Sequence, residues 1–180
     1  MAMLRLKNCT SMELEKNKLT HFFDQDYKTK GQINYEQENR LELLTYLSLN
    51  SNACSEIPQI CKHLGRLQQL HMHMNRVSNV RELCRSAFAK LEVLDLSGNR
   101  LSEIPVAFVY FLGGLTSCYL ANNDLLGLPS WIGFHKTLNT LTIDGNPMKQ
   151  IRRQVTEKGT ATILAYLRDK FVQGKDDQVE

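Results

Sequence analysis

The chain has 180 residues, of which 42% are hydrophobic and 23% are charged, a composition that is typical of a folded protein and argues against wholesale disorder. Its 22 Lys and Arg residues against 19 Asp and Glu leave a net charge of +3, a smaller excess than a basic nucleic-acid groove usually carries. The small charge excess predicts no nucleic-acid partner. No stretch approaches the ~20 apolar residues that span a bilayer, so we also expect no stable membrane insertion.

Cysteine usage and the first residues indicate the cellular compartment. The five cysteines form no CxxC pair, which makes a disulfide framework or a zinc ribbon improbable. The segment from Met1 to Arg5 lacks a continuous apolar signal. We therefore expect a cytoplasmic, intracellular protein. We also expect that it uses no cofactor.

A repeat of 23 to 24 residues organises the chain. Each copy places apolar residues at positions 1, 4, 6, 11 and 14 and an asparagine at position 9, as in Leu91, Leu94, Leu96, Asn99, Leu101 and Ile104. A degenerate copy at 9–23 comes first, and a polar insertion at 24–40 follows it. The regular repeats are 44–66, 67–90, 91–114, 115–137 and 138–158.

Each repeat begins with a strand-like pattern and continues with a helix-like one. Apolar residues alternate with period two at positions 4 and 6, as in a half-buried strand. The next residues have helical spacing, for example Phe108 and Leu112. One repeat cannot bury its apolar face alone, but stacked copies can. The pattern predicts an α/β solenoid with a concave parallel sheet and outer short helices or 3-10 turns.

The pattern LxxLxLxxNxLxxhP resembles the leucine-rich repeat family over roughly residues 9–170. The resemblance implies a horseshoe and a protein-binding scaffold, and we take 1–170 as one leucine-rich repeat domain. Asp144 to Pro147 and Lys158 to Asp169 look like the end of leucine-rich repeat-containing protein forty and its relatives, intracellular proteins with the short repeat of Ras-group scaffolds. The sequence departs from that closer pattern at Met148 to Val155.

A capping helix is predicted at 160–172, followed by a polar tail at 173–180. Thr160 is a candidate N-cap because its hydroxyl can accept a bond from the first turn. One face of this helix is apolar, and it should cover the open end of the last repeat. The residues of that face are Ile163, Leu164, Leu167 and Phe171.

The asparagine column has a predicted structural role. Each amide should point inward and bond backbone groups that the turn after the strand leaves unpaired. The members of this column are Asn17, Asn52, Asn75, Asn99, Asn123 and Asn146.

Residues at positions 2, 3, 5, 7 and 8 should point to the concave face and can vary toward a partner, and the candidates come from positions 3, 5 and 7. Tyrosines beside polar and titratable groups favour recognition there, because Tyr combines contact area with a hydroxyl. The alternative is an ordinary solvated sheet face. The predicted partner-binding residues are Tyr46, Gln69, His71, His73, Asp95, Tyr119, Thr142 and Asp144.

We therefore expect a non-enzymatic module that binds a protein or peptide, without a catalytic residue or a bound metal. One alternative is a regulatory or recruiting fragment of a larger signalling protein. A less favoured alternative is a metal site at His71, His73 and Asp95, since two imidazoles and a carboxylate can bind zinc or iron. The sequence identifies neither the partner nor the oligomeric state.

Overall fold

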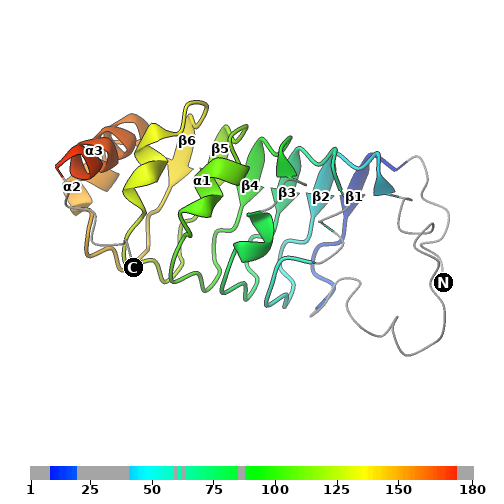
Figure 1. Cartoon of the computed structure of the whole chain (residues 1–180). Helices are drawn as coiled ribbons and strands as arrows, with labels where there is room; N and C mark the ends of the chain where they lie inside the picture. The colour runs from blue at the N-terminus through cyan, green and yellow to red at the C-terminus, as the bar shows by residue number, and fades with distance from the viewer. Residues whose placement is uncertain (1–8, 20–40, 59–60, 62–63, 85–87, 174–180) are drawn as a thin grey trace.

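The computed structural model describes residues 9–19, 41–58, 61, 64–84 and 88–173. Each repeat adds one short strand to a parallel sheet whose strands follow one another in chain order (Figure 1). The predicted α/β leucine-rich repeat solenoid is therefore confirmed. The strands are β1 (Ser11–Glu13), β2 (Tyr46–Ser48), β3 (Gln69–His71), β4 (Val93–Asp95), β5 (Ser117–Tyr119) and β6 (Thr140–Thr142).

The central residue of every strand lies in one row across the sheet. Leu47 pairs in register with Leu70, and Leu70 pairs with Leu94. Cys118 follows Leu94 in the same row, where its thiol occupies a leucine position as a small hydrophobic group. These central side chains are buried, whereas most residues on either side of them are partly or fully exposed. Period two in the sequence thus gives one core face and one outward face.

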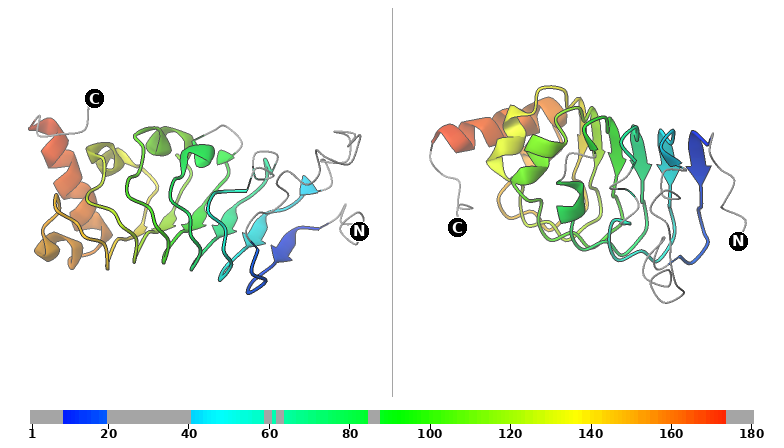
Figure 2. Two further views of the ribbon diagram at one scale, coloured as in Figure 1. Left: turned by 90° about the horizontal axis from the view of Figure 1, so that it is seen from below. Right: turned by 45° about the vertical axis from the view of Figure 1, so that its right-hand side comes forward.

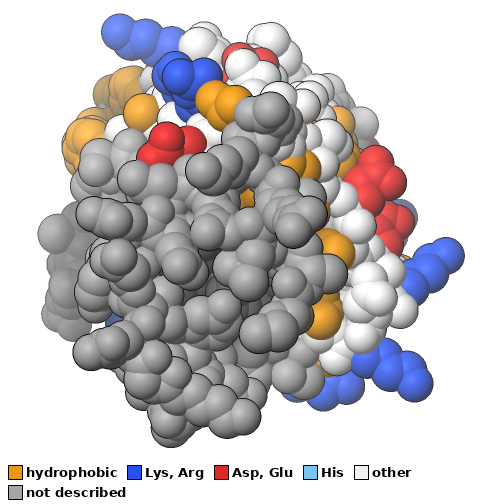
Figure 3. All heavy atoms as spheres, turned by 90° about the vertical axis from the view of Figure 1, so that its right-hand side faces the viewer, with side chains coloured by type: hydrophobic (Ala, Val, Ile, Leu, Met, Phe, Trp, Pro, Cys, Tyr) orange, Lys and Arg blue, Asp and Glu red, His pale blue; other side chains and the backbone are white. Residues whose placement is uncertain are grey.

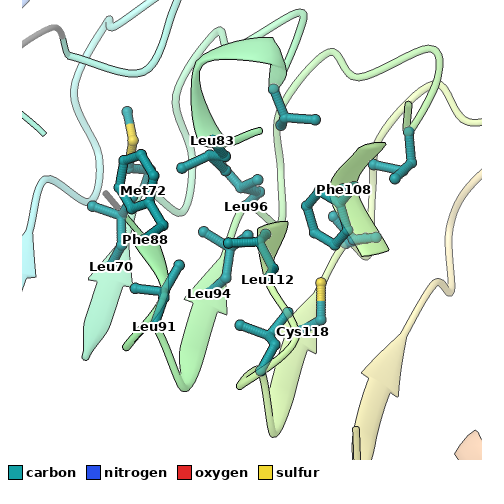
Figure 4. Packing of buried hydrophobic residues seen from close by; sticks show 14 of the residues in the cluster. Leu70, Met72, Leu83, Phe88, Leu91, Leu94, Leu96, Phe108, Leu112 and Cys118 are labelled. Atoms are coloured by element: carbon teal, nitrogen blue, oxygen red, sulfur yellow. The ribbon is translucent and has the colours of Figure 1, made fainter. Parts of the chain in front are cut away.

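The core fills the space between the sheet and the outer segments. Figure 4 shows side chains of successive turns that point into this space, among them Leu70, Leu94 and Phe108. Full burial of a leucine or phenylalanine contributes roughly 1.5–3 kcal/mol. The stability of the stack therefore depends on contacts between neighbouring turns.

Short helical segments lie on the side of the stack opposite the strands (Figure 2). They are η4 (Arg81–Leu83), α1 (Ala107–Phe111) and η6 (Ser130–Phe134). Helices this short are marginal on their own and are held by packing, in agreement with the predicted short helices or 3-10 turns.

Two further helices end the stack, α2 (Arg153–Thr156) and α3 (Thr160–Val172). The α3 helix packs against η6 and buries Ile163, Leu164 and Leu167. The predicted N-cap at Thr160 is wrong, because Gly159 precedes the helix and no side chain caps it. The hydroxyl of Thr160 instead accepts the backbone N–H of Leu141 at 2.8 Å, which joins the helix to β6.

The asparagines of position 9 bond backbone groups of their own turn and of the preceding one. Asn75 accepts the N–H of Cys54 at 3.0 Å and donates to the carbonyls of Leu49 and Met72. Four further asparagines make the same kind of bonds: Asn52, Asn99, Asn123 and Asn146.

Asn17 meets the prediction in part. Its side chain is exposed, not turned inward, and among the described residues it donates to the backbone carbonyl of Glu15, two residues earlier. Asn17 stands in the first described turn, so the described residues offer no earlier turn for its amide to bond.

Some predictions lie outside the described residues. They concern the polar insertion at 24–40 and the tail beyond residue 173. Within the described part of the chain, no helix is long and apolar enough to cross a membrane.

Candidate functional site

The outward side of the six strands, with the residue two positions after each strand, forms a surface that we call the sheet face. Most of its side chains are at least partly exposed, although Ser48 is buried. All eight predicted partner-binding residues lie on it. The sheet face consists of Ser11, Glu13, Glu15, Tyr46, Ser48, Asn50, Gln69, His71, His73, Val93, Asp95, Ser97, Ser117, Tyr119, Ala121, Thr140, Thr142 and Asp144.

Three of the predicted residues meet on β2 and β3. The rings of Tyr46 and His71 have centroids 5.2 Å apart and an interplanar angle of 38°. Gln69 is the register partner of Tyr46, and its Oε1 lies 3.4 Å from Nε2 of His71. This group presents two rings, tilted against each other, beside an amide, a combination suited to contact with both apolar and polar partner groups.

Two other predicted residues are linked by a serine. Ser97 donates its hydroxyl to Oδ1 of Asp95, and its backbone N–H reaches the same oxygen at 2.9 Å. The serine oxygen therefore accepts from Nδ1 of His73, 2.9 Å away, so we assign the Nδ1–H tautomer to that ring. Asp95 and His73 are held in place without direct contact.

A second carboxylate, Glu15, is not among the predicted residues, because it belongs to the degenerate repeat. Its Oε1 accepts from Ser48 at 2.6 Å and from Asn50 at 3.0 Å. Asn50 in turn accepts the backbone N–H of His73 at 2.7 Å. The bonds from Ser48 and Asn50 lower the pKa of Glu15, so its charged form is stabilised.

The remaining predicted residues stand apart from these groups. Among the described residues, no hydrogen bond joins the side chain of Tyr119, Thr142 or Asp144 to another residue. Strand pairing places Tyr119 beside Asp95 and Thr142 beside Tyr119. Their side chains are therefore available to a partner.

The geometry does not support the alternative metal site. In the part of the chain that the structure describes, no group of three His, Cys, Asp or Glu side chains is placed to hold a metal ion. Nε2 of His71 faces Gln69, and Nδ1 of His73 faces Ser97. The two imidazoles and Asp95 therefore do not converge on one metal position.

The buried thiols do not form a nucleophilic site. Burial raises the pKa of Cys61 and of Cys118 to about 12, because the thiolate is poorly solvated in the core. Both thiols remain protonated near neutral pH.

Comparisons with known proteins identify the repeat. A family model described as Leucine Rich Repeat matches residues 90–111. The mouse leucine-rich repeat serine/threonine-protein kinase 1 is 33% identical over 90 residues, which are 48% of this chain and 4% of that protein. Zebrafish keratocan is 28% identical over 151 residues, 81% of this chain and 40% of keratocan. The chain thus spans less than half of each of these relatives.

Solved structures agree with the sequence relatives. A leucine-rich repeat protein of Leptospira interrogans superposes with a TM-score of 0.70 at 29% identity, over 93% of this chain and 37% of that one. The leucine-rich repeat ectodomain of the Arabidopsis thaliana receptor kinase SOBIR1 gives 0.54 at 25% identity, over 76% and 69%. With its stacked repeats and their asparagine column, the chain has the leucine-rich repeat fold and is similar in sequence to leucine-rich repeat proteins.

Proposed function

We propose that the chain is a non-enzymatic interaction module that binds a protein or peptide on the sheet face. Leucine-rich repeat folds generally serve as protein-interaction modules. The choice of surface rests on one observation: bonds between turns fix polar side chains of the sheet face, as in His73 to Ser97 and Asn50 to Glu15. A surface fixed before binding loses less conformational entropy when a partner docks.

The position of the helical segments supports the same surface. The outer segments η4, α1 and η6 lie opposite the strands, and α3 covers the end of the stack (Figure 2). Tyr46, His71 and Tyr119 therefore stay partly exposed on the strands. These side chains provide aromatic contact area, which is enriched in interaction surfaces.

The test replaces Tyr46, His71 and Tyr119 together with alanine and compares partner capture by affinity purification and mass spectrometry. The matched control replaces Arg76, Arg100 and Asp124, exposed residues that each follow an asparagine of the column. We expect the sheet-face variant to lose the specific partners and the control to retain them. Equal capture by two folded variants would contradict the proposal.

A second candidate is a recruiting segment of a larger signalling protein. The match to the mouse leucine-rich repeat serine/threonine-protein kinase 1 favours it, because the matched region is only 4% of that protein. Long-read sequencing of transcripts is the test. A transcript that joins this segment to a kinase, phosphatase or ligase domain would support it, and transcripts that encode this segment alone would contradict it.

We also propose a cytoplasmic location. The support is the burial of Cys54, Cys61 and Cys118 as free thiols in the core. Imaging of a fluorescent fusion at the native locus tests this location, and a secreted or surface signal would contradict it.

A further inference from the structure

The sheet face carries acidic charge although the whole chain is basic. Its eighteen residues include four carboxylates and no Lys or Arg, whereas the chain has a net charge of +3. On the right-hand side of Figure 3, acidic side chains form one group, and basic side chains follow directly below it. One nearby basic residue is Lys16, whose charge contributes to the lowered pKa of Glu15. The carboxylates of the sheet face are Glu13, Glu15, Asp95 and Asp144.

Two of these carboxylates are oriented by the protein and still have acceptor capacity. Both bonds to Glu15 fall on Oε1, and both bonds to Asp95 fall on Oδ1. Within the described residues, the second oxygen of each group accepts no hydrogen bond. A carboxylate held on one side in this way presents its other oxygen to a donor from outside.

Aromatic rings flank one of the two carboxylates. Asp95 pairs in register with His71 on one side and with Tyr119 on the other. Neighbouring strands are ~4.8 Å apart, so a cation at the outward oxygen of Asp95 is within the ~6 Å reach of a cation–π contact with Tyr119. The arrangement combines charge with a ring face.

The spacing between the acidic positions matches an extended chain. Glu13 and Asp95 lie in one row, three strand steps apart through Ser48 and His71, which is roughly 14 Å at ~4.8 Å per step. Four residues of extended chain cover about the same distance at ~3.4 Å each. Two basic side chains four residues apart would therefore reach both positions.

We propose that the sheet face binds an extended partner segment that carries two arginines four residues apart. One arginine bonds Asp95 and stacks on Tyr119, and the other bonds the carboxylates of Glu13 and Glu15. Arginine fits better than lysine because its planar guanidinium both pairs with a carboxylate and stacks on a ring. This inference rests on the proposed function and specifies the chemistry of the partner.

The experiment measures capture of nine-residue peptide pools by the immobilised full chain. One pool fixes arginine at the third and seventh residues, a second fixes glutamate there, and a third fixes arginine at the third and fifth residues. All other positions are randomised over uncharged residues. We expect the first pool to be retained about ten-fold more than the other two, and to be released when salt is raised from about 50 to about 300 mM.

Matched variants separate the site from general electrostatics. Asp95→Asn retains the oxygen that accepts from Ser97 and should lower retention of the first pool about five-fold. Asp124→Asn makes the same change in charge at an exposed residue outside the sheet face and should leave retention unchanged. Tyr119→Leu provides a second variant with unchanged charge and should also lower retention.

Equal retention of the three pools, or an equal effect of Asp124→Asn and Asp95→Asn, would overturn the inference. The proposed function fails separately, when the alanine variant of Tyr46, His71 and Tyr119 keeps its cellular partners. Loss of those partners together with equal retention of all pools would leave the interaction module in place and exclude the arginine-bearing segment.

Discussion

Val77 donates its backbone N–H to Oδ1 of Asn99 at 2.9 Å, although 22 residues separate the two in the chain. The same amide donates at 2.9 Å to the carbonyls of Met72 and Leu96, so a single side chain bonds backbone groups of two successive turns. Asn99 is buried, so its amide is the partner of backbone groups that lie away from solvent. Register between neighbouring turns thus depends on polar bonds as well as on leucine packing.

Asn99→Ala should lower the free energy of unfolding by about 1–3 kcal/mol, because it leaves buried backbone groups without partners. Asn17→Ala is the matched control, since Asn17 is exposed and among the described residues its side chain bonds a nearby carbonyl alone, so the effect should stay within about 0.5 kcal/mol. Urea denaturation followed by circular dichroism measures both. Similar losses for the two variants would contradict the role of the column.

Gly133→Ala should displace the α3 helix. A Cβ at residue 133 would lie 2.6 Å from the backbone nitrogen of Arg168 and 2.7 Å from the carbonyl oxygen of Leu164. Neither backbone atom can move without shifting the helix, so we expect a loss of about 1–3 kcal/mol.

Trp131 reports on this displacement, since it is the one tryptophan of the chain and its ring lies 4.4 Å from that of Phe171 on α3. Gly133→Ala should change its fluorescence and lower the unfolding midpoint. Gly113→Ala is the control, because a Cβ there meets nothing within 4 Å. An unchanged Trp131 signal in Gly133→Ala would show that α3 does not rest on this glycine.

The sheet could be predicted from the sequence because the apolar residues that form its core recur at a fixed period. Leu47, Leu70 and Leu94 recur at fixed spacing, and a parallel stack is the arrangement that buries all of them. Asn17 differs from the rest of the column for a physical reason, since the oxygen of each later asparagine bonds the preceding turn, and Asn17 stands in the first described turn. The error at Thr160 arose because β6 provides a competing donor for its hydroxyl, the N–H of Leu141.

The sheet face was predictable only as a set of positions. The frame placed His73 and Asp95 on the same side of the sheet, but not the serine hydroxyl that links them. That link depends on side-chain rotamers, which a repeat pattern does not specify. Glu15 was missed for a related reason, because its importance comes from Ser48 and Asn50, which lie 33 and 35 residues later.

Thiol labelling should distinguish the buried cysteines from the others. Burial raises the pKa of Cys61 and Cys118 to about 12, so on the order of 10⁻⁴ of each thiol is ionised at pH 8. Mass spectrometry after maleimide treatment should show Cys9, which is partly exposed, modified first in the native protein. Cys61 and Cys118 should react only in denaturant. Their rapid modification in the native state would contradict the packed core.

Ser48→Ala should raise the pKa of Glu15 toward its ordinary value, because the serine bond is the largest cause of its lowering. A lowered pKa in the folded state stabilises the protein above the unfolded-state pKa, and this contribution is lost as the pH falls through the folded-state pKa. The stability difference between wild type and Ser48→Ala should therefore shrink on acidification. Carbon-13 NMR titration of the Glu15 carboxyl and urea denaturation at several pH values measure the two effects.

Ser11→Ala is the control for this prediction. It changes an exposed serine of β1 that makes no bond to Glu15, so it should leave the titration unchanged. If Ser48→Ala also left it unchanged, the bond between Ser48 and Glu15 would not be what holds this carboxylate in its charged form.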